Sequence, residues 1–395
     1  MSRRKASVGL NVILLGITSL LTDTSSEIAM PILPIFISML APAGMAAMAV
    51  GLVGGLGDSV ANLLKVPSGY WSDRIGRRKP LVALGYFSSA VAKLFMPLAT
   101  AWHHLLVLRP LERVGKGIRT APRDALVAES APQEVRGKAF GIHRAMDTTG
   151  AIAGSAIALL LVLAGIGIRE ILIISAAIAF IALIPIYFVR DVGSKPKETG
   201  LIAGFGQLSK PFKKYILITA IFALSDFTYM LFILKAREAL TGVVQGVWVN
   251  AIPILLYVLF NVSYAALSVP SGTLSDRIGR RRVLVMGYLV YAATCLGFSA
   301  WQAIPLMALL FLLYGVSKAL VDGTQRAYAS DLAPPELKGT ALGTFHTTTG
   351  FATLFAGVVA GALWTGLGAS ATFLYGFALA LASALLMAAF TEGEK

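Results

Sequence analysis

Long apolar runs alternate with short polar segments along the whole chain. Each run is close to the roughly 20 apolar residues that a helix needs to cross a bilayer, so each predicts a membrane-spanning helix. The twelve runs cover about residues 10–38, 45–66, 80–100, 103–125, 138–163 and 169–189, then 213–237, 244–268, 283–300, 303–325, 340–366 and 368–390. The first run is longer than the apolar part of a signal peptide, so we expect a retained helix.

A polar segment divides these runs into two sets of six. We expect an N-terminal six-helix half at 1–189, a cytoplasmic linker at 190–214 and a C-terminal six-helix half at 215–395. The stretch VPSGYWSDRIGRR, which begins at Val66, recurs as VPSGTLSDRIGRR at Val269 and matches at 11 of 13 positions. The sequence therefore predicts an all-α integral membrane protein whose halves are related by internal duplication, one of the known plans of transporters.

Composition supports a bilayer as the surrounding medium. The chain is 56% hydrophobic and 14% charged, whereas soluble proteins average about 25% charged residues. The net charge of +14 does not indicate a nucleic-acid partner, because the bases lie in short loops between apolar runs. The single cysteine, Cys295, excludes a disulfide within the chain, and no Cys/His spacing indicates a metal site. We expect a monomer without enzymatic activity or a cofactor.

Basic residues favour one side of the predicted membrane. The loops on the side of the two termini hold 21 Lys and Arg residues, and the opposite side holds three, Arg169, Lys235 and Arg237. Because basic loops stay in the cytoplasm, this asymmetry predicts a multi-pass cell-membrane protein with both termini and the linker cytoplasmic.

The repeated loop resembles the signature of the major facilitator superfamily, Gly-x-x-x-Asp-Arg/Lys-x-Gly-Arg/Lys-Arg/Lys. The matching residues are Gly69, Asp73, Arg74, Gly76, Arg77 and Arg78, and in the second copy Gly272, Asp276, Arg277, Gly279, Arg280 and Arg281. The resemblance implies alternating access, a substrate site in a central cavity between the halves, and a cytoplasmic latch that includes the loop acids. In the first copy we expect Arg77 beside Asp73.

The predicted fourth helix matches a second family pattern, Arg-x-x-Gln-Gly-x-Gly, in part. The stretch RPLERVG keeps Arg109 and Gly115, but Glu112 and Arg113 replace the glutamine and the first glycine. The resemblance therefore links Arg109 alone to proton coupling.

The predicted fifth helix matches the antiporter pattern of the family in spacing. Gly141, Gly150 and Gly154 keep the intervals of its helix-packing glycines, and Ser155 replaces its proline. The resemblance modestly favours an exporter.

The predicted fourth helix also carries bases at membrane depth. Arg109, Arg113, Lys116 and Arg123 follow one helical stripe. A base at the centre of a bilayer costs roughly 2.5–3.5 kcal/mol of insertion, so we expect this stripe to face a water-filled cavity or acidic partners. The alternative for Arg119 and Arg123 is that they reach the cytoplasmic interface.

Acids on the predicted first and fifth helices could form ion pairs with these bases. Asp23 and Glu27 lie four residues apart on one helical face, as do His143 and Asp147. Arg109 could pair with a first-helix acid, or Arg113 could bind an anionic substrate, and a purely structural ion-pair network is the alternative. The predicted proton-coupling residues are Asp23, Glu27, Arg109 and Asp147.

The predicted substrate residues extend into the second half. Lys318 and Asp322 lie four residues apart, so we expect them to neutralise each other. The full predicted set is Arg113, Lys116, His143, Arg144, Asp226, Asn250, Asn261, Lys318, Asp322 and His346.

These features predict a secondary active transporter, driven by protons, that exports a small organic or drug-like molecule. One alternative is an exchanger of organic anions or phosphate esters, because arginine binds carboxylates and phosphates bidentately. Weaker alternatives are divalent-metal transport through the acids and His143, and a sensor or lipid-moving protein on the same fold.

Overall fold

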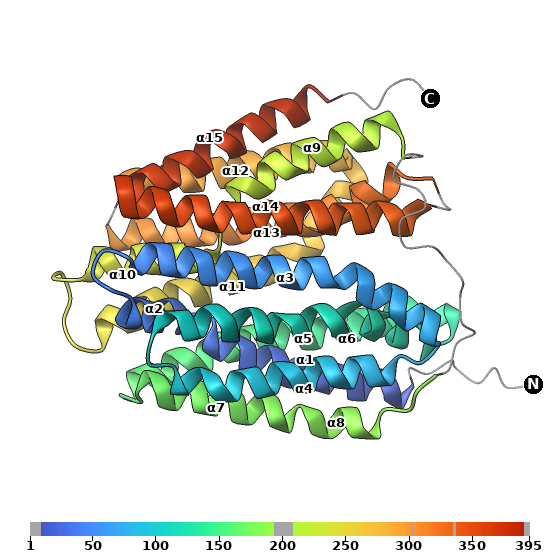
Figure 1. The fold of residues 1–395 in the computed structure, drawn as a ribbon. Helices are drawn as coiled ribbons and strands as arrows, with labels where there is room; N and C mark the ends of the chain where they lie inside the picture. Colours follow the sequence, from blue (N-terminus) through green and yellow to red (C-terminus); the bar gives the residue numbers. More distant parts are fainter. Residues whose placement is uncertain (1–8, 193–207, 302, 335–336, 391–395) are drawn as a thin grey trace, which may run out of the picture. The chain divides into compact units, whose positions relative to one another are not determined.

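The structure is a computed structural model that describes residues 9–192, 208–301, 303–334 and 337–390 (Figure 1). Within these ranges the regular structure is helical, apart from an isolated bridge between Thr241 and Val244. Most of the predicted linker and the terminal bases counted for topology lie outside the described residues.

The helices follow one another along the chain with short connections. They are α1 (Leu10–Ala29), α2 (Leu33–Leu40), α3 (Ala46–Ile75), α4 (Lys79–Phe95), η1 (Met96–Leu98), α5 (Trp102–Glu129), η2 (Gln133–Val135), α6 (Arg136–Leu163), α7 (Ile168–Ile181), α8 (Leu183–Phe188), α9 (Lys210–Ser225), α10 (Tyr229–Leu240), α11 (Trp248–Ile278), α12 (Arg280–Ala300), α13 (Ile304–Asp331), α14 (Lys338–Leu367) and α15 (Ala369–Ala388).

The predicted membrane helices are present in the fold. Eleven spans of the described chain are long and apolar enough to cross a bilayer, and they match eleven of the predicted runs. The remaining run, 103–125, forms the 28-residue helix α5. Its charged side chains, not its length, set it apart from the other spans. The prediction of an all-helical, multi-pass membrane protein is therefore confirmed.

Two of the spans contain a break of three residues that belong to neither of the flanking helices. The span Leu10–Leu40 consists of α1 and α2, and its helical pattern breaks around Pro31, which has no N–H to donate. The span Lys210–Leu240 consists of α9 and α10, and its break begins at Asp226. Discontinuous membrane helices leave backbone groups available near transport sites. Both interrupted segments are therefore candidates for part of a transport site.

The chain divides into two compact units. Unit 1 consists of Met1–Ile32, Val60–Ala99 and Val107–Leu201, and unit 2 of Leu33–Ser59, Thr100–Leu106 and Ile202–Lys395. Helices α3 and α5 thus each contribute residues to both units. The predicted boundary between two six-helix halves at 190–214 stays a prediction.

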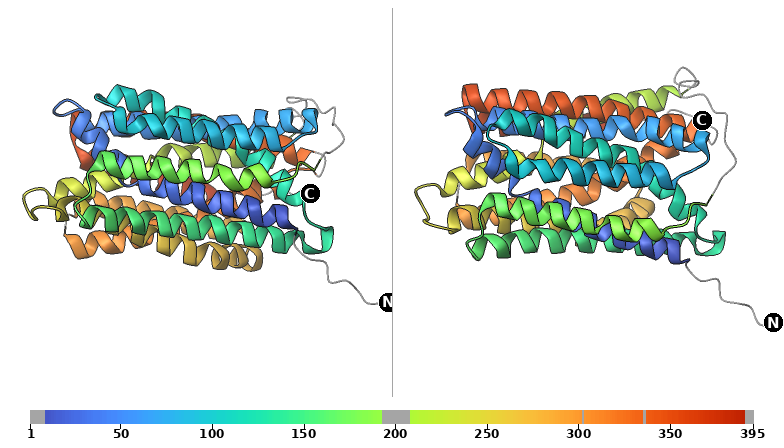
Figure 2. Two further views of the ribbon diagram at one scale, coloured as in Figure 1. Left: turned by 90° about the horizontal axis from the view of Figure 1, so that it is seen from below. Right: turned by 60° about the horizontal axis from the view of Figure 1, so that its bottom comes forward.

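In unit 1, α1 packs closely along α6 (Figures 1 and 2). A Cβ atom at Gly150 or Gly154 would overlap the carbonyl oxygen of Leu20 or Thr24, so only glycine permits this approach. Gly141, in contrast, is exposed, and a Cβ there would meet open space. Gly141 lies on the exposed face of α6, between the buried residues Ala139 and His143, so its predicted packing role stays a prediction.

In unit 2, aromatic rings fill the space between the helices. Phe222 of α9 stacks on Tyr288 of α12 at a centroid distance of 4.0 Å, and Phe232 of α10 stacks on Tyr314 of α13 at 4.4 Å. Helix α12 also packs against α15. Offset ring stacking adds to the stability that burial of the rings provides.

Candidate functional site

Arg109 and Glu112 form a buried ion pair on α5. A guanidinium nitrogen of Arg109 lies 2.6 Å from Glu112 Oε2, and their side chains are 2% and 0% exposed. Arg109 also approaches the sulfur of Met30 at 3.0 Å. Of the possibilities that the sequence left open, the pairing of Arg109 with a first-helix acid is not the one found here. Its acid lies three residues along the same helix, at an interval that brings side chains together.

Two further bases of α5 lie near this pair, Arg113 of the stripe and Arg119 outside it. Arg113 Nε is 3.9 Å from Glu112 Oε2. Arg119 donates to Ser89 Oγ at 2.8 Å and lies over the ring of Tyr86, 4.5 Å from its centroid. Because Arg119 is buried in this way, the alternative that it reaches the cytoplasmic interface is wrong.

Arg123 lies nearer the end of α5. It pairs with Asp124 at 2.9 Å and donates to Ser19 Oγ of α1 at 3.1 Å. The stripe of bases thus contacts both its own helix and α1.

The predicted acids of α1 face the same region of unit 1. Asp23 lies within electrostatic range of Asp147 in α6 and of Lys116 and Arg123 in α5. Glu27 faces α6, because its Cβ lies 2.8 Å from the Cβ position at Gly154. The structure therefore brings the predicted coupling acids of α1 and α6 into one neighbourhood with the α5 stripe.

Asp147 of α6 is buried between two basic partners. Its Oδ2 lies 3.6 Å from His143 Nδ1 and 3.7 Å from a guanidinium nitrogen of Arg144. The Arg144 side chain is largely exposed. The predicted shared face of His143 and Asp147 is thus present in the structure.

In unit 2, Lys318 of α13 pairs with Asp226 at the break between α9 and α10. The Nζ–Oδ2 distance is 2.5 Å. The predicted pairing of Lys318 with Asp322 is therefore wrong, because the helix break brings a closer acid to the lysine. Asp322 instead accepts a hydrogen bond from Tyr264 Oη of α11 at 3.1 Å.

The other predicted substrate residues of unit 2 are dispersed. Asn250 accepts from Arg237 Nε at 3.0 Å, near the ends of α10 and α11. Asn261 is buried in α11, and His346 of α14 is half-buried with its ring against Phe345. Of the predicted unit 2 residues, Asp226, Lys318 and Asp322 lie on or beside the helix break and α13.

Sequence reasoning missed a row of aromatic rings beside these charges. Tyr257, Phe260 and Tyr264 follow one face of α11, with successive centroids 5.5 Å and 6.1 Å apart. Their spacing of three and four residues was the available signal. Tyr264 links the row to Asp322.

Sequence reasoning also missed Lys93 of α4. It is a buried lysine in the otherwise apolar run 80–100. The insertion cost that marked the bases of α5 applies to Lys93 as well, so the sequence contained its signal.

In the first copy of the repeated loop, Arg78 lies between two membrane spans and forms an ion-pair cluster with acids at the ends of helices. Arg78 contacts Asp73 at 2.5 Å and Glu129, at the end of α5, at 3.0 Å. Burial alone would lower the pKa of Arg78, but its hydrogen bonds and charge interactions with Glu129 and Asp73 outweigh burial and raise that pKa. Arg77, the base expected beside Asp73, is exposed.

The second copy forms a similar cluster with a different arginine. Arg280 lies 2.6 Å from Asp276 and 3.2 Å from Asp331 at the end of α13. Arg280 occupies the position of Arg77, not of Arg78, in the repeat.

Other loop residues contribute backbone geometry and peripheral contacts. Gly76 and Gly279 have positive φ angles of 68° and 96°, which favour glycine. Gly69 approaches α5, since a Cβ there would lie 3.3 Å from Ala121 Cβ. Arg74 donates to Tyr70 Oη at 3.2 Å, and Arg277 is exposed.

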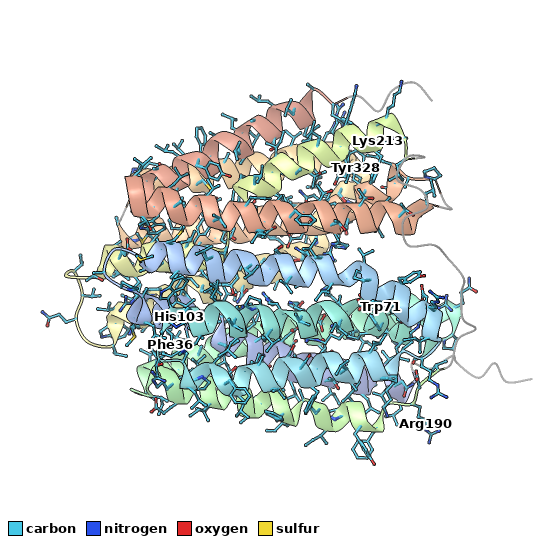
Figure 3. All side chains as sticks on the ribbon, viewed as in Figure 1. Phe36, Trp71, His103, Arg190, Lys213 and Tyr328 are labelled. Atoms are coloured by element: carbon cyan, nitrogen blue, oxygen red, sulfur yellow. The ribbon has the colours of Figure 1, made fainter. Side chains whose placement is uncertain are left out.

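The first copy of the repeated loop also exposes a large apolar side chain close to its charged residues. Trp71, labelled in Figure 3, lies between Gly69 and Asp73 in sequence and is 55% exposed. A large exposed indole next to loop charges is typical of a membrane–water interface.

Within the described ranges, no group of three or more His, Cys, Asp or Glu side chains could hold a metal ion. The four residues of the weak metal alternative therefore do not form a ligand set in this arrangement.

The described chain forms a helical, multi-pass membrane fold with ion pairs inside its spans, and ionisable groups at such depth commonly serve ion or substrate pathways. The model of the Major Facilitator Superfamily matches residues 15–260 and 217–395. The chain belongs to this superfamily, whose members are transporters of small molecules and not enzymes.

Relatives and solved structures agree with this assignment. The chain is 46% identical over 380 residues to an uncharacterized MFS-type transporter of Methanocaldococcus jannaschii, covering 95% of this chain and 94% of that protein. It is 26% identical over 328 residues to the multidrug resistance protein MdtG of Salmonella paratyphi C, covering 77% and 76% of the two chains. The fold matches the crystal structure of the nucleoside transporter NupG with a TM-score of 0.76 at 15% identity, covering 96% and 98%.

Proposed function

We propose that this secondary transporter exports a small organic molecule in exchange for protons. The observation that carries the proposal is the gathering of ionisable groups at membrane depth in unit 1. There Asp23 and Glu27 of α1 and Asp147 of α6 lie near the bases of α5. Ionisable groups inside a bilayer are costly and typically serve ion or substrate pathways. A carboxylate whose basic neighbours change during transport can bind and release a proton.

Two similarities favour export. The spacing of Gly141, Gly150 and Gly154 resembles the antiporter pattern, and the chain is 26% identical to a protein named for multidrug resistance. Arg109 acts in this proposal by holding Glu112. The proposed substrate contacts are Arg113, Lys116, His143, Arg144, Asp226, Asn250, Asn261, Lys318, Asp322 and His346.

A ligand screen followed by flux measurement tests the proposal. Purified protein is screened by thermal shift against organic cations and anions, including ethidium and fluorescein, and each stabilising compound is tested in proteoliposomes. We expect the compound to accumulate in the lumen against its own gradient only when the pH gradient drives protons out of the lumen. This accumulation should be lost when an uncoupler collapses the pH gradient. Accumulation that survives the uncoupler would contradict proton coupling.

Exchange of organic anions is the second candidate. It is favoured by Lys116 of the α5 stripe, which has no carboxylate within the ion-pair distance of 4.0 Å among the described residues. A substrate carboxylate or phosphate would supply that partner. Anion exchange that is equally fast with and without a pH gradient would favour this candidate.

We further propose that both termini and the segment 190–214 are cytoplasmic, because 21 bases lie on that side and three on the other. Single cysteines at Arg77 and Val243, introduced with Cys295→Ser, test this orientation in intact cells. A membrane-impermeant thiol reagent should label the Val243 position and spare the Arg77 position. The reverse pattern would invert the topology.

A further inference from the structure

Lys93 lies among hydroxyl groups in the interior of unit 1. Its side chain is 2% exposed, and its Nζ donates to Ser25 Oγ and Ser26 Oγ of α1, each at 2.9 Å. Ser25 donates its own hydroxyl proton to the carbonyl oxygen of Ser175 in α7 at 2.6 Å. The Ser25 oxygen is therefore oriented to accept from Lys93, and the lysine joins α4 to the α1–α7 contact.

The lysine has hydroxyl partners where a buried ammonium would need an acid. No carboxylate of the described residues lies within 4.0 Å of Lys93 Nζ. The two hydrogen bonds use two N–H groups, the number that a neutral amine has, whereas an ammonium has three. A buried charge without an ionic partner is costly, so this site suits an amine that is charged for only part of the time.

Charged groups of both signs face Lys93 from α1 and α5. They include Asp23, Arg109, Glu112 and Arg119. Arg113 lies 3.9 Å from the Glu112 carboxylate, and Glu27 follows Ser26 on α1. Protonation of Lys93 therefore adds a positive charge that has no acid in direct contact with its Nζ among the described residues.

The other neighbouring elements do not supply an opposite charge. Helix α7 contributes Ser175, and its Arg169 lies past the end of α4, where it donates to the Ala99 carbonyl at 2.9 Å. Glu170 follows at the start of α7, beside Gly167. On α4 itself, the ring of Tyr86 faces Arg119.

We propose that Lys93 binds and releases a proton during the transport cycle. In the arrangement described here its Nζ is held by the hydroxyl groups of the two serines. When α1 shifts and water or an acid reaches it, the nitrogen lone pair accepts one proton, and the return movement releases that proton to water. This step forms and breaks one N–H bond only. The inference rests on the proposed proton coupling and adds a base to its acids.

The protonation state of Lys93 can be measured without a substrate. Protein labelled with ¹³C at the lysine ε carbons is titrated by NMR in detergent, and Lys93→Arg assigns the signal. We expect the signal that Lys93→Arg removes to change below about pH 9, where ordinary lysines stay charged. Lys65→Gln is the matched control, because Lys65 is a half-buried membrane-helix lysine that donates to Asn62 Oδ1 at 2.7 Å. That control should retain the titrating signal. A Lys93 signal that stays fully charged to about pH 9 overturns the proposal.

Flux measurements separate proton exchange from a structural role. Arginine stays charged and glutamine stays neutral, so Lys93→Arg and Lys93→Gln should both abolish pH-driven ethidium flux. Lys65→Gln should retain it. Wild-type coupling in either well-folded Lys93 variant overturns the proposal. If Lys93 stays charged throughout the NMR titration, the Lys93 proposal fails, and proton-coupled export through the acids is unaffected. If the wild-type protein shows no proton coupling, the proposed function fails, and the titration result for Lys93 is unaffected.

Discussion

Removal of Glu112 should destabilise the protein strongly, because it strands Arg109 in the interior. The pair is 2.6 Å apart with side chains 2% and 0% exposed. Breaking a buried pair by removing one partner costs about 3–5 kcal/mol. Arg113 Nε lies 3.9 Å from the same carboxylate oxygen, so Glu112→Ala also removes a negative charge from beside Arg113. We therefore expect a loss in the upper part of that range.

An exposed pair of equal length provides the control. Arg280 and Asp276 are also 2.6 Å apart, but their side chains are 25% and 64% exposed. Solvent screens such a pair, and its loss costs about 0–1 kcal/mol. Asp276→Asn should therefore leave the free energy of unfolding nearly unchanged. Burial, and not distance, determines the difference between the two variants.

Reversible unfolding in SDS, followed by tryptophan fluorescence and helical circular dichroism, measures both costs. The double variant Arg109→Leu with Glu112→Leu should recover most of the stability, because replacing both partners of a buried pair with apolar groups is often neutral or stabilising. Equal losses for Glu112→Ala and Asp276→Asn would refute the reasoning, as would a double variant less stable than Glu112→Ala.

Three further predictions concern transport and packing. Asp73→Asn should impair transport with little change in abundance on immunoblots, with a milder effect for Asp276→Asn, and normal transport in the first variant would remove the latch role. Replacing Asp23 and Glu27 together with amides should abolish pH-driven accumulation while substrate exchange persists in liposomes; if the pH gradient still drives uphill transport, Asp147 is the next candidate. Gly154→Leu should destabilise unit 1 by about 1–3 kcal/mol in the SDS assay, because its Cβ would overlap the Thr24 carbonyl, and an unchanged unfolding midpoint would contradict that packing.

The helices were predictable because apolar runs of membrane length have few alternatives. Even α5, the most charged span, was identified by its length and its position between apolar neighbours. The two helix breaks, at Pro31 and at Asp226, were not equally predictable. A proline predicts the first break, whereas no residue type in the sequence requires the second.

The pairing of charges was not predictable to the same degree. A helix offers each base several acids at similar separation, and sequence spacing cannot show which one a bend brings close. Lys318 illustrates this limit, because the break at Asp226 supplies an acid from another helix in place of Asp322.

The repeated loops show how a small local difference changes a partner. In the first copy, three residues separate the end of α3 at Ile75 from the start of α4 at Lys79, and Arg78 reaches back to the acid. In the second copy, Gly279 alone separates α11 from α12, and Arg280 makes the contact. Identical sequence motifs thus use arginines that differ by one position.

The direction of proton movement tests proton-coupled export most directly. Proteoliposomes with a trapped pH-sensitive dye receive, on the outside, a compound that the protein binds. Exchange for protons predicts that substrate entry makes the lumen more alkaline, and that the double amide variant of Asp23 and Glu27 abolishes this change. Substrate entry that acidifies the lumen, or leaves its pH unchanged, would contradict proton-coupled export.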